Sequence, residues 1–422
     1  MQTVKVPQLS WYDTKELELP LPGNWQVTTY NMAGYNRPAL KLHEIQARIN
    51  NLIELPRIRD LAKNKNEVVI ISDDTTRGTK ASNIIPFVLE ELAAAGIPDD
   101  RIRFVIGFGM HGALAREDMV KKLGEDVVAR FPVYNHNPFA NCSYVGTTTT
   151  YKTDVYINEE VLGCDFRIAI GTIVPHSMSG FSGGAKIILP GVSSWETIRH
   201  NHSMFRKTRE ENMDNPITGM GNFDNNPMRA DIDEAGKLVH LDVLINCILN
   251  TWGEIVSVYA GAMEPTYSAA IKDAKAHYVT PKIEDNDIVI ANTFNSAKMA
   301  EKGLPIAYPA VNHNGGDIVL ITNAPDGPAT HYGGGGFGNI ITAKRNLPSR
   351  VPQHIKHFIL YTEYPDGKWN RFKDSNRPDM FMQIHKWDDV IASLQKLHGK
   401  GTKVAVYPNA DCQYCINGGS YV

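Results

Sequence analysis

Short apolar runs rich in valine and isoleucine recur along the chain, and most are followed by a loop and then by a stretch with helical periodicity. Such runs are typical of strands buried on both faces, as in a parallel sheet with helical crossover connections. They lie at residues 67–74, 101–109, 164–173, 287–294, 316–325 and 357–363. Apolar residues at helical spacing follow at residues 84–96 and 116–131. This alternation predicts an α/β chain with mostly parallel sheets.

The length of the chain predicts two domains, because 422 residues exceed what one hydrophobic core usually supports. A helical pattern leads through Pro281 into a new strand, and contacts commonly thin out at such a link. We expect an N-terminal catalytic and cofactor-binding α/β domain at 1–264, a helical connector at 265–280 and a C-terminal α/β domain at 281–422. The active site would lie in the interdomain cleft, which would open and close about the connector. The glycine run at 333–336 predicts a mobile loop.

Charge and composition argue against several classes of protein. The net charge is −3 and no long run of lysine and arginine occurs, which argues against nucleic-acid and anionic-membrane binding. The N-terminus lacks a signal-peptide pattern and no apolar run is long enough to cross a bilayer, so we expect a cytoplasmic protein. The five cysteines do not make a disulfide framework. Only Cys412 and Cys415 have redox or metal spacing, and with no second pair nearby a structural role is favoured.

Three loops that follow predicted strands are rich in reactive side chains. In an open α/β sheet, such loops converge at the carboxyl ends of the strands. The first, SDDTTRGT at residues 72–79, could bind an anion through backbone N–H groups, hydroxyls and Arg77, or could be a helix N-cap with a local Asp–Arg pair. The second places His111 between glycines, where it is either structural or exposed in a cleft.

The third loop is PHSMSGFSGGAKIILPG, at residues 175–191. It begins with His176 after a strand and places Lys186 at the start of an apolar segment. Its small residues, Gly183 and Gly184 among them, let the backbone approach a ligand closely. A lysine in this setting favours nucleophilic or covalent chemistry, and the alternative is a lysine that reaches solvent from a glycine-rich turn. The GxxxxGK[ST] spacing of a Walker loop is absent.

Two further histidines, His200 and His202, flank Asn201. Alternate spacing cannot place both on one face of a helix, so we expect at most one to face the site. Neutral imidazole binds zinc, nickel, copper or iron, but no HExxH or CxxC partner completes a cage of protein ligands. A metal here would take its other ligands from something else.

Together these residues resemble the nickel-dependent lactate racemase family. The resemblance covers residues 60–260 and continues more weakly into the C-terminal domain. It implies a racemase or epimerase, an isomerase that inverts a 2-hydroxy acid by reversible hydride transfer. The implied cofactor is a nickel-pincer nucleotide, pyridinium-3,5-bisthiocarboxylate mononucleotide nickel, covalently attached to a lysine and supplied by cofactor-biosynthesis enzymes. The matching residues are Asp74 to Arg77, His111, His176, GFSGGAK ending at Lys186, LPG at 189–191 and Asn201–His202.

The resemblance also implies a role for each matching residue. Lys186 would be the cofactor tether and His202 the protein ligand of nickel. His111 and His176 would be the acid/base pair on opposite faces of the substrate. The other implied roles are cofactor binding by Thr75, Thr76, Gly183 and Gly184, and substrate binding by Arg77, Asp74 and Lys302.

Several positions depart from the family pattern. The arginine that precedes the family's lysine is Ala185 here, and the arginine that follows its first histidine is Gly112. The family's Tyr-Gln-x-x-Lys run corresponds to residues 298–302, where only Lys302 remains. Trp369 is the candidate for the family's active-site tryptophan. These departures predict a substrate other than lactate, such as a sugar acid or a dicarboxylic hydroxy acid.

Three other functions stay open at this stage. A hydride-transferring oxidoreductase that binds free nicotinamide nucleotide would need a GxGxxG after a strand with an acidic residue further on, and this pattern is missing. A metal-dependent hydrolase could use His111, His176 and His202, but its general-base glutamate is not evident. A non-catalytic binding or cofactor-storage protein would keep the lysine loop without turnover.

Overall fold

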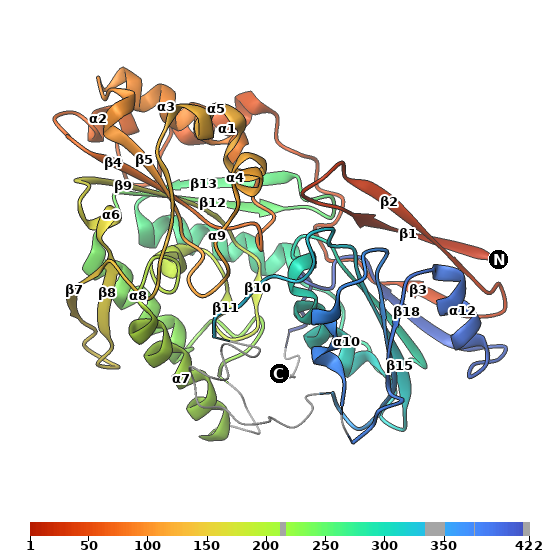
Figure 1. The fold of residues 1–422 in the computed structure, drawn as a ribbon. Coiled ribbons are helices and arrows are strands. Elements are labelled where there is room, and N and C mark those ends of the chain that lie inside the picture. Colours follow the sequence, from red (N-terminus) through yellow and green to blue (C-terminus); the bar gives the residue numbers. More distant parts are fainter. Residues whose placement is uncertain (212–216, 334–350, 375, 417–422) are drawn as a thin grey trace. The chain divides into compact units, whose positions relative to one another are not determined.

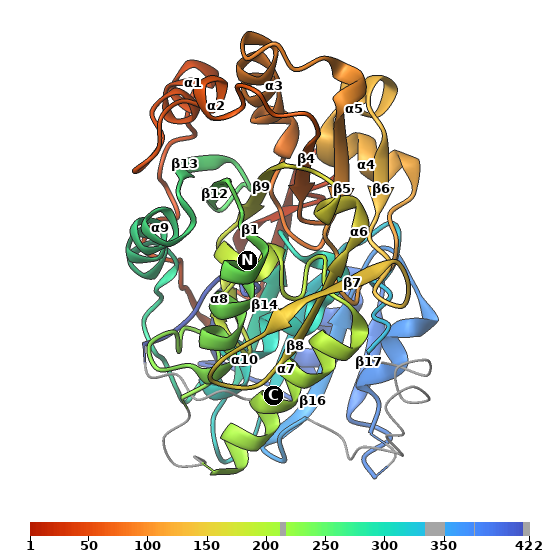
Figure 2. The same ribbon diagram turned by 90° about the vertical axis from the view of Figure 1, so that its left-hand side faces the viewer.

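A computed structural model describes residues 1–211, 217–333, 351–374 and 376–416. They form two compact units, the central unit (Asn36–Lys275) and the terminal unit (Met1–Tyr35 with Ala276–Val422). Each is built on a mostly parallel sheet of six strands with helices around it, which confirms the predicted fold class (Figures 1 and 2). Most of the glycine run at 333–336 lies outside the described residues. None of the helices in the described ranges has the length and apolar character that a membrane span requires.

The central unit contains one six-stranded sheet and two smaller strand pairs. Its strands are β4 (Val68–Ser72), β5 (Ile102–Ile106), β6 (Val133–Asn135), β7 (Cys142–Thr147), β8 (Asp154–Asn158), β9 (Phe166–Thr172), β10 (Pro175–His176), β11 (Gly180–Phe181), β12 (Val243–Leu249) and β13 (Ile255–Gly261). The sheet has the order β13-β12-β9-β4-β5-β6, and all neighbours are parallel except β12 and β13. The antiparallel pairs β7–β8 and β10–β11 lie outside it.

Helices cover both faces of this sheet, which is why its middle strands are mostly apolar and almost entirely buried. The α-helices are α1 (Leu42–Asn50), α2 (Ile58–Leu61), α3 (Ile85–Ala94), α4 (Arg116–Leu123), α5 (Glu125–Arg130), α6 (Glu159–Leu162), α7 (Trp195–Glu211), α8 (Pro227–Val239) and α9 (Met263–Tyr278). The 3₁₀ helices are η1 (Ala81–Asn83), η2 (Asp99–Arg101) and η3 (Gly184–Ile187). Figure 1 shows α1, α2 and α3 on one side of the sheet and α8 and α9 on the other.

The predicted strands of this unit are confirmed, but one predicted helix is divided. Residues 67–74, 101–109 and 164–173 contain β4, β5 and β9. The helix predicted at 116–131 is instead α4 followed by α5, and the two meet at Gly124. Gly124 has φ +98°, which is incompatible with a helix and which glycine adopts readily. Apolar spacing that continues across the glycine conceals this break in the sequence.

The terminal unit joins the two ends of the chain in one parallel sheet of order β17-β16-β15-β14-β18-β3. Its strands are β1 (Gln2–Gln8), β2 (Lys15–Leu21), β3 (Gln26–Thr29), β14 (Ile288–Thr293), β15 (Gly316–Thr322), β16 (Ile355–Tyr361), β17 (Phe381–Ile384) and β18 (Lys403–Tyr407). Its described helices are η4 (Ala297–Gly303), α10 (Leu304–Ala310), η5 (Gly367–Phe372) and α12 (Trp387–Gln395). The strands predicted from the apolar runs are confirmed as β14, β15 and β16.

Successive residues of β14 face opposite sides of the sheet, as the pleat of a strand requires. Ile288 and Ile290 belong to the core formed with the β1–β2 hairpin and α12. Val289 and Ala291 belong to the core formed with η4 and α10. Because both sides of the strand are covered, residues 288–291 form a continuous apolar run.

The N-terminal segment belongs to the terminal unit. Strand β3 extends the sheet by pairing with β18, and Trp387 donates a hydrogen bond from Nε1 to the carbonyl of Pro20 (2.9 Å). The structure therefore differs from the division predicted at 1–264, 265–280 and 281–422, whose connector corresponds to most of α9. A strand finds its sheet neighbour through space, and this pairing leaves no local signal in the sequence.

Candidate functional site

The loops predicted to carry the chemistry follow three neighbouring strands of the central unit. Strands β5, β4 and β9 are parallel and adjacent, so the residues that follow them meet at one edge of the sheet. The loop at 72–79 follows β4, His111 follows β5 and the loop at 175–191 follows β9. The structure thus brings these sequence-predicted segments to the same edge.

Asp74 and His111 are in direct contact. The ring Nδ1 of His111 lies 2.5 Å from Oδ2 of Asp74, whose Oδ1 accepts hydrogen bonds from the backbone N–H (2.8 Å) and the hydroxyl (2.5 Å) of Thr76. Burial acts against ionisation of Asp74, but His111, Arg77 and Thr76 outweigh it and hold its pKa well below the usual range. An ionised carboxylate can only accept, so His111 carries its proton at Nδ1.

Arg77 lies on the same turn as Asp74. Its Nη1 donates to Oγ1 (3.0 Å) and to the carbonyl (3.2 Å) of Thr76, and its backbone N–H donates to the carbonyl of Asp74 (3.1 Å). Thr75 and Thr76 are buried and the arginine is half-buried. A planar guanidinium held in this way is suited to a carboxylate or phosphate group.

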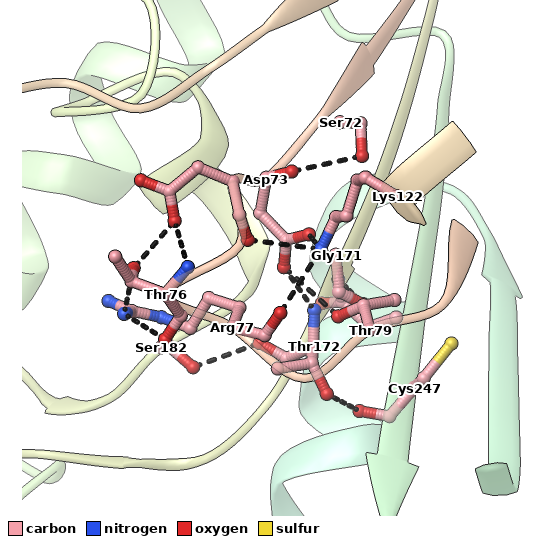
Figure 3. A network of polar contacts seen from close by, with 12 residues as sticks. Ser72, Asp73, Thr76, Arg77, Thr79, Lys122, Gly171, Thr172, Ser182 and Cys247 are labelled. Carbon is pink, nitrogen blue, oxygen red and sulfur yellow. Dashed lines mark hydrogen bonds and ion pairs between the residues drawn. The ribbon is translucent and has the colours of Figure 1, made fainter. Parts of the chain in front are cut away.

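Beneath this turn lies an ion pair that no pattern in the sequence predicts. Nζ of Lys122, in α4, is 2.5 Å from Oδ1 of Asp73, the residue that follows β4, and Figure 3 shows the pair at the centre of a polar network. Each residue of the pair lies in a recognisable local pattern. Asp73 is the first aspartate of the SDD motif, and Lys122 is three residues after Met119 in an amphipathic helix. Neither pattern connects the two residues, which are brought together by packing.

His176 occupies β10, and its ring is fixed by the backbone that follows. Nδ1 accepts hydrogen bonds from the N–H groups of Met178 (3.2 Å) and Ser179 (3.3 Å). A backbone N–H only donates, so Nδ1 carries no proton and the neutral ring holds its hydrogen at Nε2. The two candidate acid/base histidines therefore have opposite tautomers.

The lysine loop, residues 175–191, turns through glycines before it reaches Lys186. Gly183 and Gly184 have φ of +78° and +59°, which side chains other than glycine rarely adopt. The N–H of Gly184 donates to Oδ1 of Asn246 in β12 (2.9 Å). Lys186 follows in η3 and is 8% exposed, so its stem packs inside the unit and does not extend into solvent.

Two large side chains that no sequence motif marks hold the same loop from the helix side. Arg229 in α8 donates to the carbonyl of Gly183 (3.0 Å), and its guanidinium lies 4.1 Å from the centre of the Tyr267 ring. The Tyr267 hydroxyl, from α9, donates to the carbonyl of Ser182 (2.9 Å). A cation over an aromatic face is an attractive contact, and here it joins two helices to the loop.

His202 lies in α7 and is half-buried. Its neighbour Asn201 is buried and donates to Oδ2 of Asp231 (2.8 Å) and to the carbonyl of Met228 (3.2 Å), which ties α7 to α8. His200 lies elsewhere on the helix and lines a separate cavity. His202 is therefore carried by a helix that packs on α8, the same helix whose Arg229 holds the lysine loop.

Ala185 and Gly112, two departures from the family pattern, have different surroundings. Ala185 is 1% exposed, and a Cβ built on Gly236 of α8 would lie 2.6 Å from its Cβ. The side chain at 185 thus faces α8, and an arginine there would require α8 to move. Gly112 is half-buried beside His111. Ala185 consequently gives no information about the size of a substrate pocket.

Two predicted residues lie in the terminal unit. Lys302, in η4, donates to Oγ of Ser296 (3.2 Å). The ring of Trp369 is fully buried in the core of that unit, where it stacks on Phe372. The ring therefore has no exposed surface at which a substrate could bind, unlike the active-site tryptophan expected from the resemblance.

The cysteine pair near the C-terminus consists of free thiols. Cys412 is 1% exposed, and Cys415 donates from Sγ to the carbonyl of Pro281 (3.6 Å). Burial raises the pKa of the Cys415 thiol to about 11. Because redox and metal chemistry use the thiolate, these surroundings favour a structural role.

Comparisons with known proteins agree on one family. Residues 12–214 match the family model described as the lactate racemase N-terminal domain. The chain is 31% identical over 402 residues to a lactate racemase from Lactiplantibacillus plantarum, a match that covers 89% of this chain and 91% of that protein. It is 27% identical over 394 residues to a lactate racemase from Thermoanaerobacterium thermosaccharolyticum, covering 90% and 84% of the two proteins.

Two solved structures have the same fold. The lactate racemase apoprotein from T. thermosaccharolyticum matches with a TM-score of 0.74 at 22% identity, covering 99% of this chain and 100% of that one. The crystal structure of a protein from Thermotoga maritima matches with a TM-score of 0.65 at 17% identity, covering 89% and 98%. The identity to the L. plantarum protein, which extends over most of both sequences, shows that this chain belongs to the lactate racemase family of isomerases.

Proposed function

We propose that the protein racemises or epimerises a 2-hydroxy acid by reversible hydride transfer to a lysine-tethered nickel-pincer nucleotide. Relatives named lactate racemase support the coarser activity, racemisation of a small lactate-like hydroxy acid. The observation that carries the proposal is the hydrogen bond between Asp74 and His111, with Arg77 on the same turn. It combines a proton acceptor and a carboxylate-binding group, the two functions that a hydroxy acid substrate requires.

The side chains available fit a cofactor that brings its own metal ligands. Within the described ranges, no group of three or more histidine, cysteine, aspartate or glutamate side chains is arranged to hold a metal ion. Lys186 supplies an amine for attachment and His202 an imidazole for the metal, and η3 and α7, which carry them, both pack on α8. When bound, the cofactor would supply a reversible hydride acceptor for the C2 hydrogen. Loading would require cofactor-biosynthesis enzymes.

The histidine tautomers determine where protons are held. With its proton at Nδ1 towards Asp74, His111 has a lone pair at Nε2 that can accept the hydroxyl proton of one enantiomer. His176 presents its hydrogen at Nε2 and can donate a hydrogen bond to the substrate oxygen. Arg77 binds the carboxylate and fixes which face of C2 is presented. In this proposal Thr75, Thr76 and the two glycines of the lysine loop contact the cofactor.

We further propose that the substrate is a hydroxy acid other than lactate. Gly112 beside His111 leaves more room than an arginine, and residues 298–301 lack the tyrosine and glutamine of the family's substrate-contacting run. A larger or more polar acid, such as a sugar acid or a hydroxy dicarboxylate, would use the space beside His111. Polarimetry with a panel of chiral hydroxy acids identifies the substrate.

The experiment that tests the proposed function is the intact mass of protein produced together with the cofactor-biosynthesis enzymes. We expect added mass on the peptide that contains Lys186, and nickel in the protein. Lys186→Ala should abolish both the added mass and turnover, whereas His111→Ala and His176→Ala should keep the added mass and lose turnover. Absence of both added mass and nickel from the parent protein would rule the proposal out.

A further inference from the structure

Lys122 is a fully buried lysine for which the proposed chemistry has no role. Its side chain has no exposed surface, and Nζ is 2.5 Å from Oδ1 of Asp73. Nζ also donates to the backbone carbonyls of Asp74 (3.1 Å) and Arg77 (3.2 Å). Both carbonyls belong to the arginine loop, which we define as residues 73–77. The lysine is thus bonded to the backbone of the two residues whose side chains are proposed to act in the site.

The charge state of Lys122 follows from these partners. All three are oxygen atoms that accept hydrogen bonds, and only an ammonium group has three hydrogens to donate. Burial lowers the pKa of Lys122 and raises that of Asp73, and their mutual attraction opposes both effects. The geometry therefore favours the charged pair.

Asp73 extends this network to the lysine loop. Its Oδ2 accepts hydrogen bonds from the hydroxyl of Thr79 (3.1 Å) and from the N–H of Thr172 at the end of β9 (3.0 Å). The carbonyl of Thr172 accepts from Oγ of Ser182 (2.9 Å), as Figure 3 shows. The partly buried carboxylate of Asp73 thus links Lys122 of α4, the segment after β4 and the start of the glycine turn that leads to Lys186.

Stability alone does not account for a buried ion pair at this position. Replacing such a pair by apolar side chains of similar volume is often neutral or stabilising, because removing two charges from water costs as much as their attraction returns. What an apolar pair cannot do is donate hydrogen bonds to the carbonyls of Asp74 and Arg77. The conformation of the arginine loop is therefore the property that depends on Lys122.

We propose that Lys122 is a positioning residue, whose buried ammonium group, held by Asp73, fixes the arginine loop so that Asp74 orients His111 and Arg77 is presented to the substrate. This inference rests on the proposed function. Lys122 would contact neither substrate nor cofactor. Lys122 would affect the reaction only through the backbone of the arginine loop.

The kinetic test separates positioning from folding. Lys122→Met leaves the partly buried carboxylate of Asp73 without its charged partner and should lower both Tm and kcat/KM. Adding Asp73→Asn removes that charge and keeps an acceptor for Thr172, so the double variant should recover most of the Tm while its kcat/KM stays at least tenfold below the parent value. Lys121→Met, on the same helix turn but paired with Asp118 (3.6 Å), is the matched control and should change neither quantity.

A second double variant covers the case in which the first folds poorly. Lys122→Gln with Asp73→Asn, like the methionine version, carries no charge at either position. It keeps an amide at position 122 that can donate to a carbonyl of the arginine loop. At matched folded fraction, we expect it to be several-fold more active than the methionine version. Equal activity of the two, or parent activity in a double variant whose Tm has recovered, would overturn the inference.

A spectroscopic measurement on the unloaded protein does not depend on turnover. The Nδ1 proton that His111 shares with Asp74 should give a downfield imidazole N–H resonance in protein labelled at histidine, assigned by its loss in His111→Gln. We expect Lys122→Met with Asp73→Asn to abolish this resonance and Lys121→Met to keep it. If the loaded parent converts no hydroxy acid, the proposed function fails while the resonance still tests Lys122. An unchanged resonance contradicts the positioning role by itself.

Discussion

Asp73 and Asp74 are adjacent carboxylates in different surroundings. Burial opposes ionisation of both, but the outcome differs. At Asp73 burial raises the pKa, while the attraction of Lys122 opposes this shift and favours the charged pair. At Asp74, His111 and Arg77 together outweigh burial, so its pKa is lowered and it stays ionised at neutral pH. Asp74 is therefore the carboxylate that sets the tautomer of His111.

Asp74→Asn should leave the fold and cofactor attachment intact but lower kcat by about 100-fold, within the range that positioned acid–base groups supply. The asparagine amide can present either its oxygen or its NH2 group to the imidazole, whereas a carboxylate only accepts. The tautomer of His111 is therefore no longer fixed. The measurement is kcat on the identified hydroxy acid, with the mass of the Lys186 peptide as control. A kcat within twofold of the parent value would contradict the role of Asp74.

His136 should make stability depend on pH. Its Nε2 donates to the carbonyl of Ser193 (2.9 Å), its Nδ1 accepts from the amide of Asn158 (3.1 Å), and burial lowers its pKa to about 4. The folded-state pKa of His136 lies below the value of about 6.5 in an unfolded chain. The contribution of the neutral ring to the free energy of unfolding is therefore complete above pH ~6.5 and is lost as the pH falls towards ~4. The loss is about 3 kcal/mol of unfolding free energy.

Urea unfolding of His136→Gln at pH 7 and pH 4.5 measures this contribution. The variant should be less stable than the parent at pH 7 and should lose less stability on acidification. His43→Gln, at an exposed histidine, is the control and should follow the parent curve. Equal losses on acidification in the parent and His136→Gln would show that another group is responsible.

The conformation of the lysine loop is fixed by hydrogen bonds to elements that are distant in sequence. Arg229 of α8 and Tyr267 of α9 bind its carbonyls, and Asn246 of β12 accepts from one of its N–H groups. Gly184 passes between these groups. A Cβ added there would lie 2.6 Å from Nη2 of Arg229 and 2.8 Å from the Tyr267 ring. The glycine is required both by its backbone conformation and by this close approach.

Gly184→Ala should therefore destabilise the protein and reduce cofactor attachment at Lys186. We expect about 1–2 kcal/mol from the left-handed backbone and roughly 1–3 kcal/mol more from overpacking. Gly96→Ala is the matched control, because Gly96 also has positive φ (+83°) but nothing within 4 Å of its added Cβ. Thermal unfolding and the attached fraction by mass give the comparison. Equal effects at both positions would show that the contacts with Arg229 and Tyr267 are unimportant.

At the scale of the whole molecule, the terminal unit is assembled from both ends of the chain. The β1–β2 hairpin covers one face of its sheet and β3 forms the edge beside β18. The apolar side chains that the N-terminal segment adds to this core are Val6, Leu19, Leu21 and Trp25.

Deletion of residues 1–30 should abolish cooperative unfolding of the terminal unit, because it exposes the face of the sheet that includes Ile288, Ile290 and Val404. The central unit contains none of the deleted residues and should keep its own transition. Calorimetry and binding of a hydrophobic dye report the change. Lys5→Ala, which removes only exposed ion pairs, is the control. A deletion variant with the parent thermogram would contradict this account of the core.

Features that depend on neighbours in sequence were predictable from the residues. The buried strands appear as apolar runs, and the polar residues of 72–79, His111 and the lysine loop could be placed at strand ends. The structure confirms those strands and brings Asp74 to His111. The break at Gly124 was missed because apolar spacing continues across it.

The sequence by itself determined the α/β class, the strands and the loops that carry reactive groups, because apolar periodicity and turn residues act over a few positions. Tertiary structure alone decided that β3 pairs with β18, that Lys122 lies under the arginine loop and that Arg229 holds the lysine loop. These contacts join segments tens to hundreds of residues apart. They form only when packing brings the segments together, and no local pattern in the sequence identifies which distant partners will meet.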